Sequence, residues 1–450
     1  MQQIDFSQGS IRRRILAVAT PMLIAQLLNL LYNIVDRIYI GKIPGEGTLA
    51  LASIGLCFPF VTLITAFANL FGLGGAPLCA MARGKGNREG AQGIMVNAGF
   101  MLLLSGAVLT VLGIAFHRPL LYLFGASEVT YPYASSYIVI YLLGTLCVML
   151  SLGLNPYINC QGFARIGMLT VALGAAANIV LDPIFIFALH LGVRGAAIAT
   201  VLSQFLSAAW VVKFLTGKKA ELKLDFRGFC PDWHCIQHIT VLGIASFVMS
   251  FTDTLVQVAC NSMLRGFGGD LYISVMTVLN SVRQIAQTPV LAIADGASTA
   301  ISYNYGAGLY KRTRDAIRFM TQIAIGYTML VWMLVSLFPA LFIRIFNQDA
   351  ELVAAAVPAL HIYFFGFVMM AFQYAGQSTF RALGRAKYAV FFSLLRKAFI
   401  VVPLTLLLPY CWNLGVSGVF AAEPVSNCIG GLACYFTMRH VVMPELKMEN

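Results

Sequence analysis

Long apolar segments follow one another along almost the whole sequence, and they limit the possible folds more than any other feature. A helix needs about 20 apolar residues to cross the hydrocarbon core of a bilayer. The segments, separated by charged or Gly- and Pro-rich breaks, lie at residues 15–40, 49–82, 92–116, 133–157, 166–190, 193–216, 236–264, 271–303, 316–343, 352–380, 388–410 and 415–438. The sequence therefore predicts an all-α integral membrane protein with about twelve transmembrane helices.

The charge content agrees with this interpretation. Only 11% of the 450 residues are charged and 59% are hydrophobic, whereas about 25% of residues are charged in an average soluble protein. The net charge of +12 is compatible with a nucleic-acid partner, but the basic residues gather in short loops between the apolar segments, where they orient a membrane protein. We expect the lipid bilayer to be the partner and no nucleic acid to bind.

The distribution of lysine and arginine predicts the orientation. With the N terminus inside, most of the 30 basic residues fall on one side, and only Arg37 and Arg283 are predicted to lie within spans. The positive-inside rule then places both termini in the cytoplasm. We expect a multi-pass protein of a prokaryotic plasma membrane.

An internal repeat divides the chain. At one constant offset, Gly74, Gly84, Gly86 and Gly162 recur as Gly296, Gly306, Gly308 and Gly384. Six spans in each half give the halves the same membrane orientation, which is a parallel repeat of the kind found in secondary transporters. We predict two six-helix lobes related by a pseudo-two-fold axis, with an N-terminal lobe at 1–216, a cytoplasmic linker at 217–235 and a C-terminal lobe at 236–450.

A charge in the middle of a span costs about 2.5–3.5 kcal/mol, so the few that persist are candidates for function. Asp36 ends a stripe of polar residues at helical spacing that includes Asn29 and Asn33. Asn178 and Asp182 are four residues apart and therefore share a helix face. Pro183 follows and frees a backbone carbonyl at Ile179. Carboxylate, amide and carbonyl oxygens suit a small hard cation, and a carboxylate pair also suits a proton.

Other charged and metal-binding residue types allow more than one interpretation. Asp253 and Asp295 are candidates for a substrate-facing group or a second ion site, and Glu423 before Pro424 is either a relay or a partner of a kink. Cys230, His234, Cys235 and His238 form a local cluster whose spacing favours a juxtamembrane loop over a zinc site. Phosphate-binding and hydrolase motifs are missing from the sequence. Coupling to an ion gradient is the energy source that remains.

Five stretches together resemble the pattern of the MATE (multidrug and toxic compound extrusion) transporters. They are Asn33-Ile34-Val35-Asp36 with Gly41, Ala82-Arg83-Gly84-Lys85-Gly86, Asn178-Ile179-Val180-Leu181-Asp182-Pro183, Gly195-Ala196-Ala197-Ile198-Ala199-Thr200 and Tyr303-Asn304-Tyr305-Gly306-Ala307-Gly308. The resemblance covers nearly the whole chain. The last stretch is similar to the branch that includes DNA-damage-inducible bacterial members. Asp253, however, lies where another branch carries a Glu, and Asp295 lies where the resemblance implies a Gln.

The resemblance implies a twelve-helix antiporter that exports organic cations in exchange for Na⁺ or H⁺ by alternating access, and not an enzyme. Its cation site corresponds to Asp36, Asn178, Asp182 and Thr200 in this sequence. Apart from the coupling ion, no metal and no cofactor are implied. We expect a monomer that handles small amphipathic, cationic substrates. The candidates for substrate binding or a second ion site are Asn29, Asn33, Asn155, Asp253, Asp295 and Tyr303.

Two other classes compete with this prediction. A flippase of lipid-linked precursors has the same lobe architecture, but it favours a deep cationic groove, for which only Arg37 and Arg283 are predicted within spans. A passive channel or an intramembrane enzyme belongs to a different class. The internal duplication and the lack of a nucleophile constellation argue against the enzyme, and conductance in planar bilayers distinguishes a channel from an exchanger.

Overall fold

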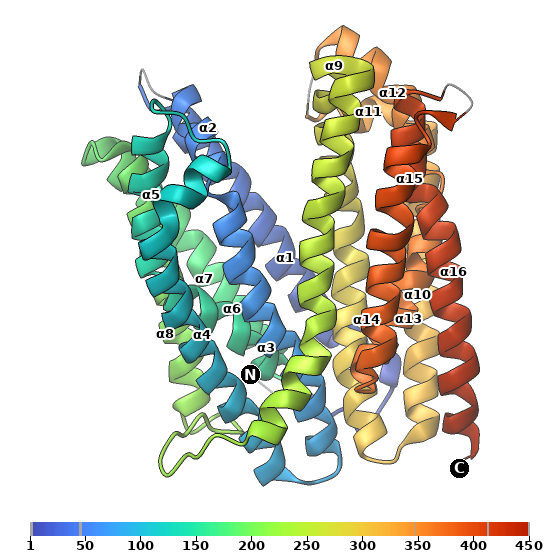
Figure 1. Cartoon of the computed structure of the whole chain (residues 1–450). Helices are drawn as coiled ribbons and strands as arrows, with labels where there is room; N and C mark the ends of the chain where they lie inside the picture. Colours follow the sequence, from blue (N-terminus) through green and yellow to red (C-terminus); the bar gives the residue numbers. More distant parts are fainter. Residues whose placement is uncertain (1–2, 45–46, 347, 412–413, 449–450) are drawn as a thin grey trace. The chain divides into compact units, whose positions relative to one another are not determined.

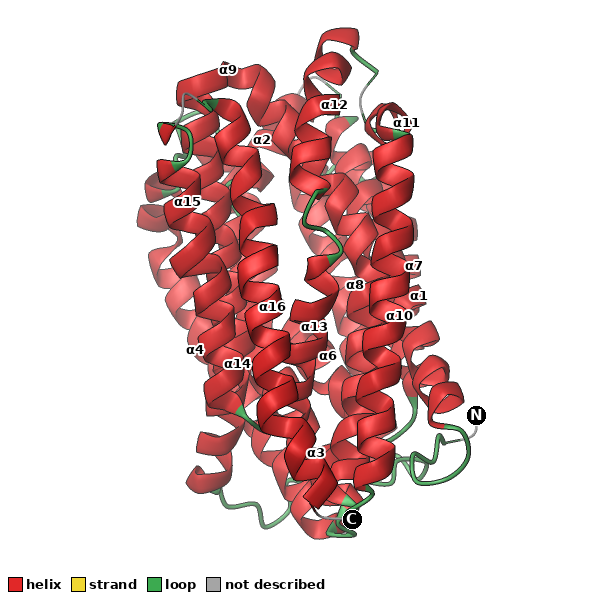
Figure 2. Ribbon diagram, turned by 90° about the vertical axis from the view of Figure 1, so that its right-hand side faces the viewer, coloured by secondary structure: helices red, strands yellow, loops and turns green. Residues whose placement is uncertain are grey.

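The computed structural model describes residues 3–44, 47–346, 348–411 and 414–448, and it is helical throughout (Figure 1). The elements are α1 (Ile11–Gly41), α2 (Gly47–Gly55), α3 (Phe58–Gly84), α4 (Arg88–Leu123), α5 (Tyr131–Leu143), α6 (Thr145–Cys160), α7 (Ala164–Pro183), the π-helix η1 (Ile184–Ala188), α8 (Gly192–Thr216), α9 (Trp233–Gly306), α10 (Tyr310–Leu337), α11 (Pro339–Arg344), α12 (Ala350–Phe364), α13 (Met369–Ala382), α14 (Ala386–Leu394), the π-helix η2 (Leu395–Val401), α15 (Val402–Leu407) and α16 (Val416–Met448). Figure 2 shows only helices and loops, and none of the described residues forms a strand. The predicted all-α class is confirmed.

Helices cover the twelve predicted spans in the described residues. Among the described residues, eight helices are long and apolar enough to cross a bilayer, and two bent pairs, α5 with α6 (56°) and α12 with α13 (49°), raise the number to ten. The other two predicted spans, 271–303 and 415–438, are also helical. Polar residues such as Asn280, Arg283 and Glu423 lower their hydropathy. Gly269 has a φ of 68° and separates the two helices that the label α9 covers, as the sequence predicts.

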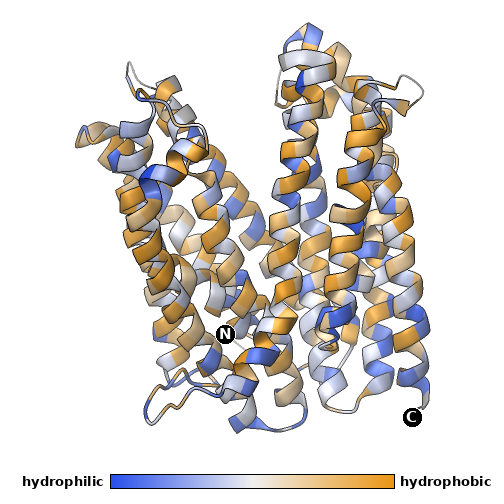
Figure 3. Ribbon diagram, viewed as in Figure 1, coloured by the Kyte–Doolittle hydropathy of each residue, from blue (hydrophilic) through white to orange (hydrophobic). Residues whose placement is uncertain are grey.

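Large apolar side chains lie on the outside of the helices, as expected where lipid is the solvent. Leu31, Val111, Phe251 and Phe399 are 51%, 66%, 60% and 67% exposed. Figure 3 shows hydrophobic residues along most of the helix lengths. Bilayer contact explains this exposure, since soluble proteins rarely leave extended apolar surfaces open.

The chain folds into two compact units, and each helical half has its own core. Unit 1 comprises Met1–Asp5 and Thr20–Gly243, and unit 2 comprises Phe6–Ala19 and Ile244–Asn450. The sequence assigned residues 6–19 to the N-terminal lobe, but the structure packs them with the C-terminal half. The Phe6 ring lies 5.7 Å from that of Tyr303, and Arg312 donates to the backbone oxygens of Phe6 and Gly9, both at 2.9 Å. These contacts bridge distant parts of the sequence and leave no local signal.

In unit 1, α3 packs against α4 and α6 and also against the first turns of α9. Small residues allow the close approach to α9. A Cβ atom on Gly74 would lie 2.4 Å from the backbone oxygen of Ile239, and one on Gly243 would lie 1.8 Å from that of Leu70. Small residues at such crossings are the usual means by which membrane helices pack tightly.

This crossing gives a first testable prediction. We expect Gly243→Ala to lower the stability of the protein by about 1–3 kcal/mol, because the added methyl group meets backbone that must shift. The midpoint of thermal unfolding in detergent measures the effect. Gly326→Ala in α10 is the matched control, since a Cβ there meets nothing within 4 Å. Equal midpoints for the two variants would contradict the close contact.

In unit 2, α13 packs against α16 around an apolar core that includes Phe364 and Phe420, both 1% exposed. The span formed by α14, η2 and α15 covers α16 on another face. Because α16 carries Glu423 and η2 carries Arg396 and Lys397, this packing brings charged side chains into the interior of unit 2.

Candidate functional site

The predicted acidic pair comes together inside unit 1. The carboxyl groups of Asp36 in α1 and Asp182 at the end of α7 lie within hydrogen-bonding reach of each other. Asn178, one turn before Asp182, donates from Nδ2 to Asp182 Oδ1 at 3.2 Å. Asp182 is 0% exposed and Asn178 2% exposed. Pro183 then ends α7, and the chain continues as the π-helix η1.

Three oxygen atoms of this acidic site lack donors. Asp36 Oδ1, Asp182 Oδ2 and Asn178 Oδ1 are buried and have no hydrogen-bond partner. A buried acceptor without a donor is costly, and two carboxylates in contact repel each other unless a proton or a cation lies between them. The described ion pairs include neither Asp36 nor Asp182. The arrangement can therefore accept a small cation or a proton.

Two tyrosines next to the acidic site were missed at the sequence level. Tyr32 in α1 and Tyr137 in α5 lie within electrostatic range of the Asp36 carboxylate. The Tyr137 ring stacks on Tyr141 at 6.1 Å and is 6% exposed. Tyr32 precedes Asp36 by four residues, so the helical spacing that selected Asn33 could also have found it. Tyr137 has no such local signal.

The remaining candidates of unit 1 are more scattered. Asn33 donates to the backbone oxygen of Asn29 at 2.6 Å, and both side chains are exposed on α1. The Thr200 hydroxyl donates to Ala196 O within its own helix at 2.9 Å. Asn155 donates to Gly167 O at 3.3 Å, which places it about 22 Å along α7 from Asp182 at 1.5 Å per residue. Asn155 therefore does not join the acidic site.

Unit 2 contains a buried basic cluster, which we define as Arg283, Arg396 and Lys397 with the acidic residues Glu423 and Asp253. Glu423 Oε1 forms ion pairs with all three basic groups, at 2.8 Å from Arg283, 3.1 Å from Arg396 and 3.2 Å from Lys397. Lys397 Nζ also lies 3.0 Å from Asp253 Oδ1. The role of Glu423, left open by the sequence, is thus that of an ion-pair partner.

The positions of Arg396 and Lys397 correct the sequence analysis. They were counted with the cytoplasmic basic residues, but they lie within the apolar span Ala386–Leu407 and are 4% and 3% exposed. Both belong to the π-helix η2, whose wider turn lets two consecutive side chains reach Glu423. π-Helical turns occur frequently at functional sites. Counting charges per segment could not reveal this local change of helix geometry.

The other acidic and aromatic candidates of unit 2 lie apart from the basic cluster. Asp295 pairs with Arg381 at 3.8 Å. It is twelve residues after Arg283 in the same helix, which corresponds to about 18 Å. Tyr303 lies two turns further on, against Phe6. Asp253 and Asp295 therefore do not form one second ion site.

The cysteine and histidine cluster, with Cys230 before α9 and the other three residues in its first turns, is not gathered around a common point. The rings of His234 and His238 lie 4.3 Å apart, and Asp232 Oδ1 accepts from the backbone N–H groups of His234 and Cys235 at 3.0 and 3.2 Å. Within the described ranges, three or more His, Cys, Asp or Glu side chains nowhere form a metal-binding group.

Two long stretches of the chain match a known protein family. The sequence model of one family, MatE, matches residues 21–184 and again residues 245–407. The chain belongs to the MatE family. The two matched stretches fall in the two halves that the glycine repeat predicts.

Curated relatives of this MatE protein cover almost its full length. The multidrug export protein MepA of Staphylococcus haemolyticus is 24% identical over 436 residues, which are 97% of this chain and 95% of the relative. An FAD transporter of Shewanella oneidensis is 25% identical over 447 residues, 96% of each chain. These relatives are transporters by name and not enzymes, which agrees with the prediction.

Solved MATE structures share the fold. A crystal structure of MATE in complex with MaD3S has a TM-score of 0.93 at 24% identity, covering 100% of this chain and 99% of the other. An outward-facing multidrug resistance MATE transporter of the MOP superfamily has a TM-score of 0.92 at 24% identity, with the same coverage. The predicted fold class and the assignment as a multi-pass membrane protein are confirmed.

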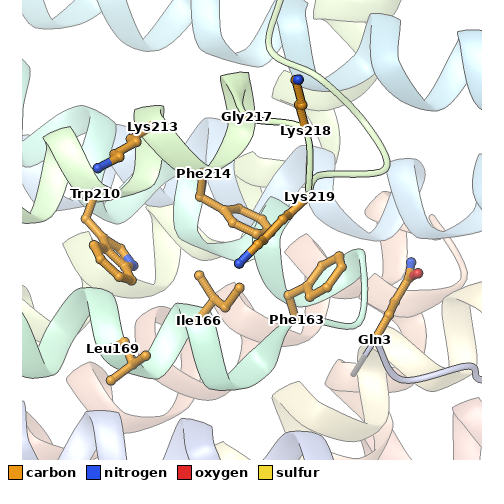
Figure 4. Close-up of a pocket in the computed structure, with 10 residues that line it drawn as sticks. All are labelled: Gln3, Phe163, Ile166, Leu169, Trp210, Lys213, Phe214, Gly217, Lys218 and Lys219. Atoms are coloured by element: carbon orange, nitrogen blue, oxygen red, sulfur yellow. The ribbon is translucent and has the colours of Figure 1, made fainter. Parts of the chain in front are cut away.

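Unit 1 of this MatE protein also has a cavity of about 860 Å³ at the start of α7 and the end of α8. Figure 4 shows its apolar side chains and the lysines around it: Gln3, Phe163, Ile166, Leu169, Trp210, Lys213, Phe214, Gly217, Lys218 and Lys219. The Lys219 side chain points toward Ile166 and Phe163, whereas Lys218 points away. Lysines that lay their stems on apolar surface are common at membrane boundaries. None of the predicted site residues lines this cavity.

Proposed function

We propose that this MatE protein exports small amphipathic compounds in exchange for Na⁺ or H⁺ bound at Asp36 and Asp182. The observation that carries the proposal is the set of buried, unpartnered oxygens on Asp36, Asp182 and Asn178. Oxygen ligands of this kind suit a hard cation, and the same carboxylate pair suits a proton. The names of the relatives, a multidrug export protein and an FAD transporter, support export of organic compounds.

Coupling follows from the cost of leaving the acidic site empty. The ion stabilises the conformation in which Asp36 meets Asp182, because it removes the repulsion between the two carboxylates. Substrate binds preferentially to the conformation in which the ion has left. An ion drives transport only through such a difference in affinity between two states. Thr200, which the family resemblance adds to the ligand set, joins the site by rotating its hydroxyl away from Ala196 O.

The remaining predictions belong to this proposal. The protein acts as a monomer in a prokaryotic plasma membrane with both termini in the cytoplasm. Whether the substrates are cations stays a prediction. Asp253 has a carboxylate that is 49% exposed and could attract a cation, but this carboxylate is already paired with Lys397.

The flippase alternative gains weight from the structure. The sequence predicts only Arg37 and Arg283 within spans, which argues against a cationic groove, but the structure adds the buried Arg396 and Lys397. Glu423 neutralises part of their charge, however, and the acidic site of unit 1 favours a cation-coupled mechanism.

Transport by the purified protein in lipid vesicles tests the proposed function. Vesicles loaded with fluorescent amphipathic dyes of either charge are placed under a Na⁺ gradient and then under a proton gradient alone. We expect one gradient to accelerate dye movement in the direction opposite to the ion, which also identifies the coupling ion. Equal rates with and without both gradients would overturn the proposal.

A further inference from the structure

The basic cluster of unit 2 carries more positive than negative charge. Arg283, Arg396 and Lys397 contribute three positive charges, whereas Glu423 and Asp253 contribute two negative ones. Ionised groups inside a membrane protein are costly unless they are paired, and those that persist usually mark a substrate or ion pathway. The surplus charge favours binding of an anionic group.

Asp253 is the accessible member of the cluster. Its side chain is 49% exposed, whereas that of its partner Lys397 is 4% exposed and that of Glu423 is 5% exposed. The Asp253 carboxylate therefore covers the ammonium group from the open side. An anion that approaches from that side reaches Lys397 by taking the place of this carboxylate.

A chain of hydrogen bonds leads from an exposed glutamine to the same cluster. Gln257 lies one turn after Asp253 in α9 and accepts from Asn280 Nδ2 at 3.0 Å. Asn280 Oδ1 accepts from the Tyr363 hydroxyl at 2.8 Å, and this hydroxyl accepts from Arg283 at 2.7 Å. Gln257 is exposed. An exposed polar side chain within an apolar span is costly against lipid, so Gln257 is expected to face water or a ligand.

The shape of the cluster is fixed by close packing. A Cβ on Gly430 would lie 3.2 Å from Arg396 Cγ, so the glycine provides room for the arginine stem. Asn427 Oδ1 accepts from Arg396 at 2.9 Å, and the Tyr363 ring lies 5.6 Å from the Arg283 guanidinium. The arginines are therefore held in place, while the Lys397 contact with Asp253 is the one at the exposed edge.

We propose that this cluster is a binding site for the anionic group of an amphipathic substrate, a carboxylate, sulfonate or phosphate, and that Asp253 is an internal carboxylate which the substrate displaces from Lys397. The inference rests on the proposed function and specifies its substrate class. The charged group of the substrate binds Lys397, with Arg283 and Arg396 contributing attraction from behind. Removal of Asp253 uncovers the ammonium group of Lys397, which then has Glu423 as its remaining acidic partner, and removal of Lys397 leaves an exposed carboxylate in its place.

Binding of two dyes to the purified, detergent-solubilised protein tests this proposal. Fluorescein, an anion at mildly alkaline pH, and tetramethylrhodamine methyl ester, a cation, share the same ring system, and fluorescence anisotropy reports their binding. We expect fluorescein to bind the unaltered protein. Asp253→Asn should tighten its binding at least about threefold, and Lys397→Met should weaken it at least about tenfold, as for loss of one charged contact. Lys387→Met, an exposed lysine of the same span, is the matched control.

Other outcomes overturn the proposal. Binding of the cationic dye alone, lost in Asp253→Asn, would show a cation site. Equal changes for both dyes in Asp253→Asn and Lys397→Met would show a structural role only. Asp253→Asn keeps the test valid if Lys397→Met misfolds, because its side chain is half exposed. The binding assay uses no gradient, so its outcome does not depend on ion coupling. Ion-independent transport in vesicles would overturn the proposed coupling but would leave the result of the binding assay unchanged.

Discussion

Replacing Asp36 with asparagine is expected to abolish gradient-driven export while the protein still folds. Asparagine keeps the size of the side chain but removes the charge that holds the ion, and it also removes the repulsion with Asp182. We expect transport in vesicles to fall at least tenfold, since the ion no longer distinguishes two states. The midpoint of thermal unfolding should stay the same or rise.

Two further variants serve as a comparison and a control for Asp36→Asn. Asp182→Asn should reproduce the loss of transport, because the two carboxylates form one site. Asp225→Asn removes a carboxylate from an exposed loop of unit 1, where it accepts from Arg227 N at 3.0 Å, and should transport normally. If Asp36→Asn and Asp225→Asn export at equal rates under the same gradient, Asp36 is not part of the coupling mechanism.

The acidic site was predictable in part because its signals are local. Asn33 and Asp36 share a helix face, and so do Asn178 and Asp182, which the spacing alone reveals. Such spacing cannot place α1 beside α7, and it gave no indication of Tyr137 in α5, which lies within electrostatic range of Asp36. Tertiary packing decides these contacts. The family resemblance supplied the pairing that spacing could not.

The basic cluster shows a different limit of sequence reasoning. Arg396 and Lys397 follow a run of basic residues from a cytoplasmic loop, so a rule based on charge counts assigned them to that loop. Both residues also lie within an apolar segment that is long enough to span a bilayer, and this position indicated a place inside the membrane more strongly than the nearby basic residues indicated a loop. A buried Glu423 needs a positive partner, and Arg283, Arg396 and Lys397 are the basic residues near it in the described structure. Pairing each buried acid with a base could have found the cluster.

The helix pattern was predicted well, and the division of the chain was predicted less completely. Twelve apolar segments correspond to helices because length and hydropathy are properties of each segment. The bends between α5 and α6 and between α12 and α13 have no comparable signal. The same holds for Phe6–Ala19, whose packing with unit 2 depends on distant residues such as Arg312.

Replacing Glu423 with glutamine is the change we expect to destabilise the protein most. Glutamine keeps the shape of the side chain and an acceptor oxygen, but it removes the negative charge that three neighbouring basic groups share. Loss of one partner of a buried ion pair costs about 3–5 kcal/mol. We expect a large fall in the midpoint of thermal unfolding in detergent. Glu445→Gln, which breaks an ion pair with Arg385 in which the glutamate is 42% exposed, should cost less than about 1 kcal/mol.

A compensated variant separates charge from packing at Glu423. Glu423→Gln combined with Lys397→Met removes one negative and one positive charge from the cluster. The double variant therefore keeps the same surplus of positive charge as the unaltered protein, although Asp253 loses its partner Lys397. We expect this double variant to recover part of the lost stability, because replacing both members of a buried pair costs less than removing one. If Glu423→Gln unfolds at the same temperature as the unaltered protein, the cluster does not carry a buried charge surplus, and the argument for an anionic substrate fails with it.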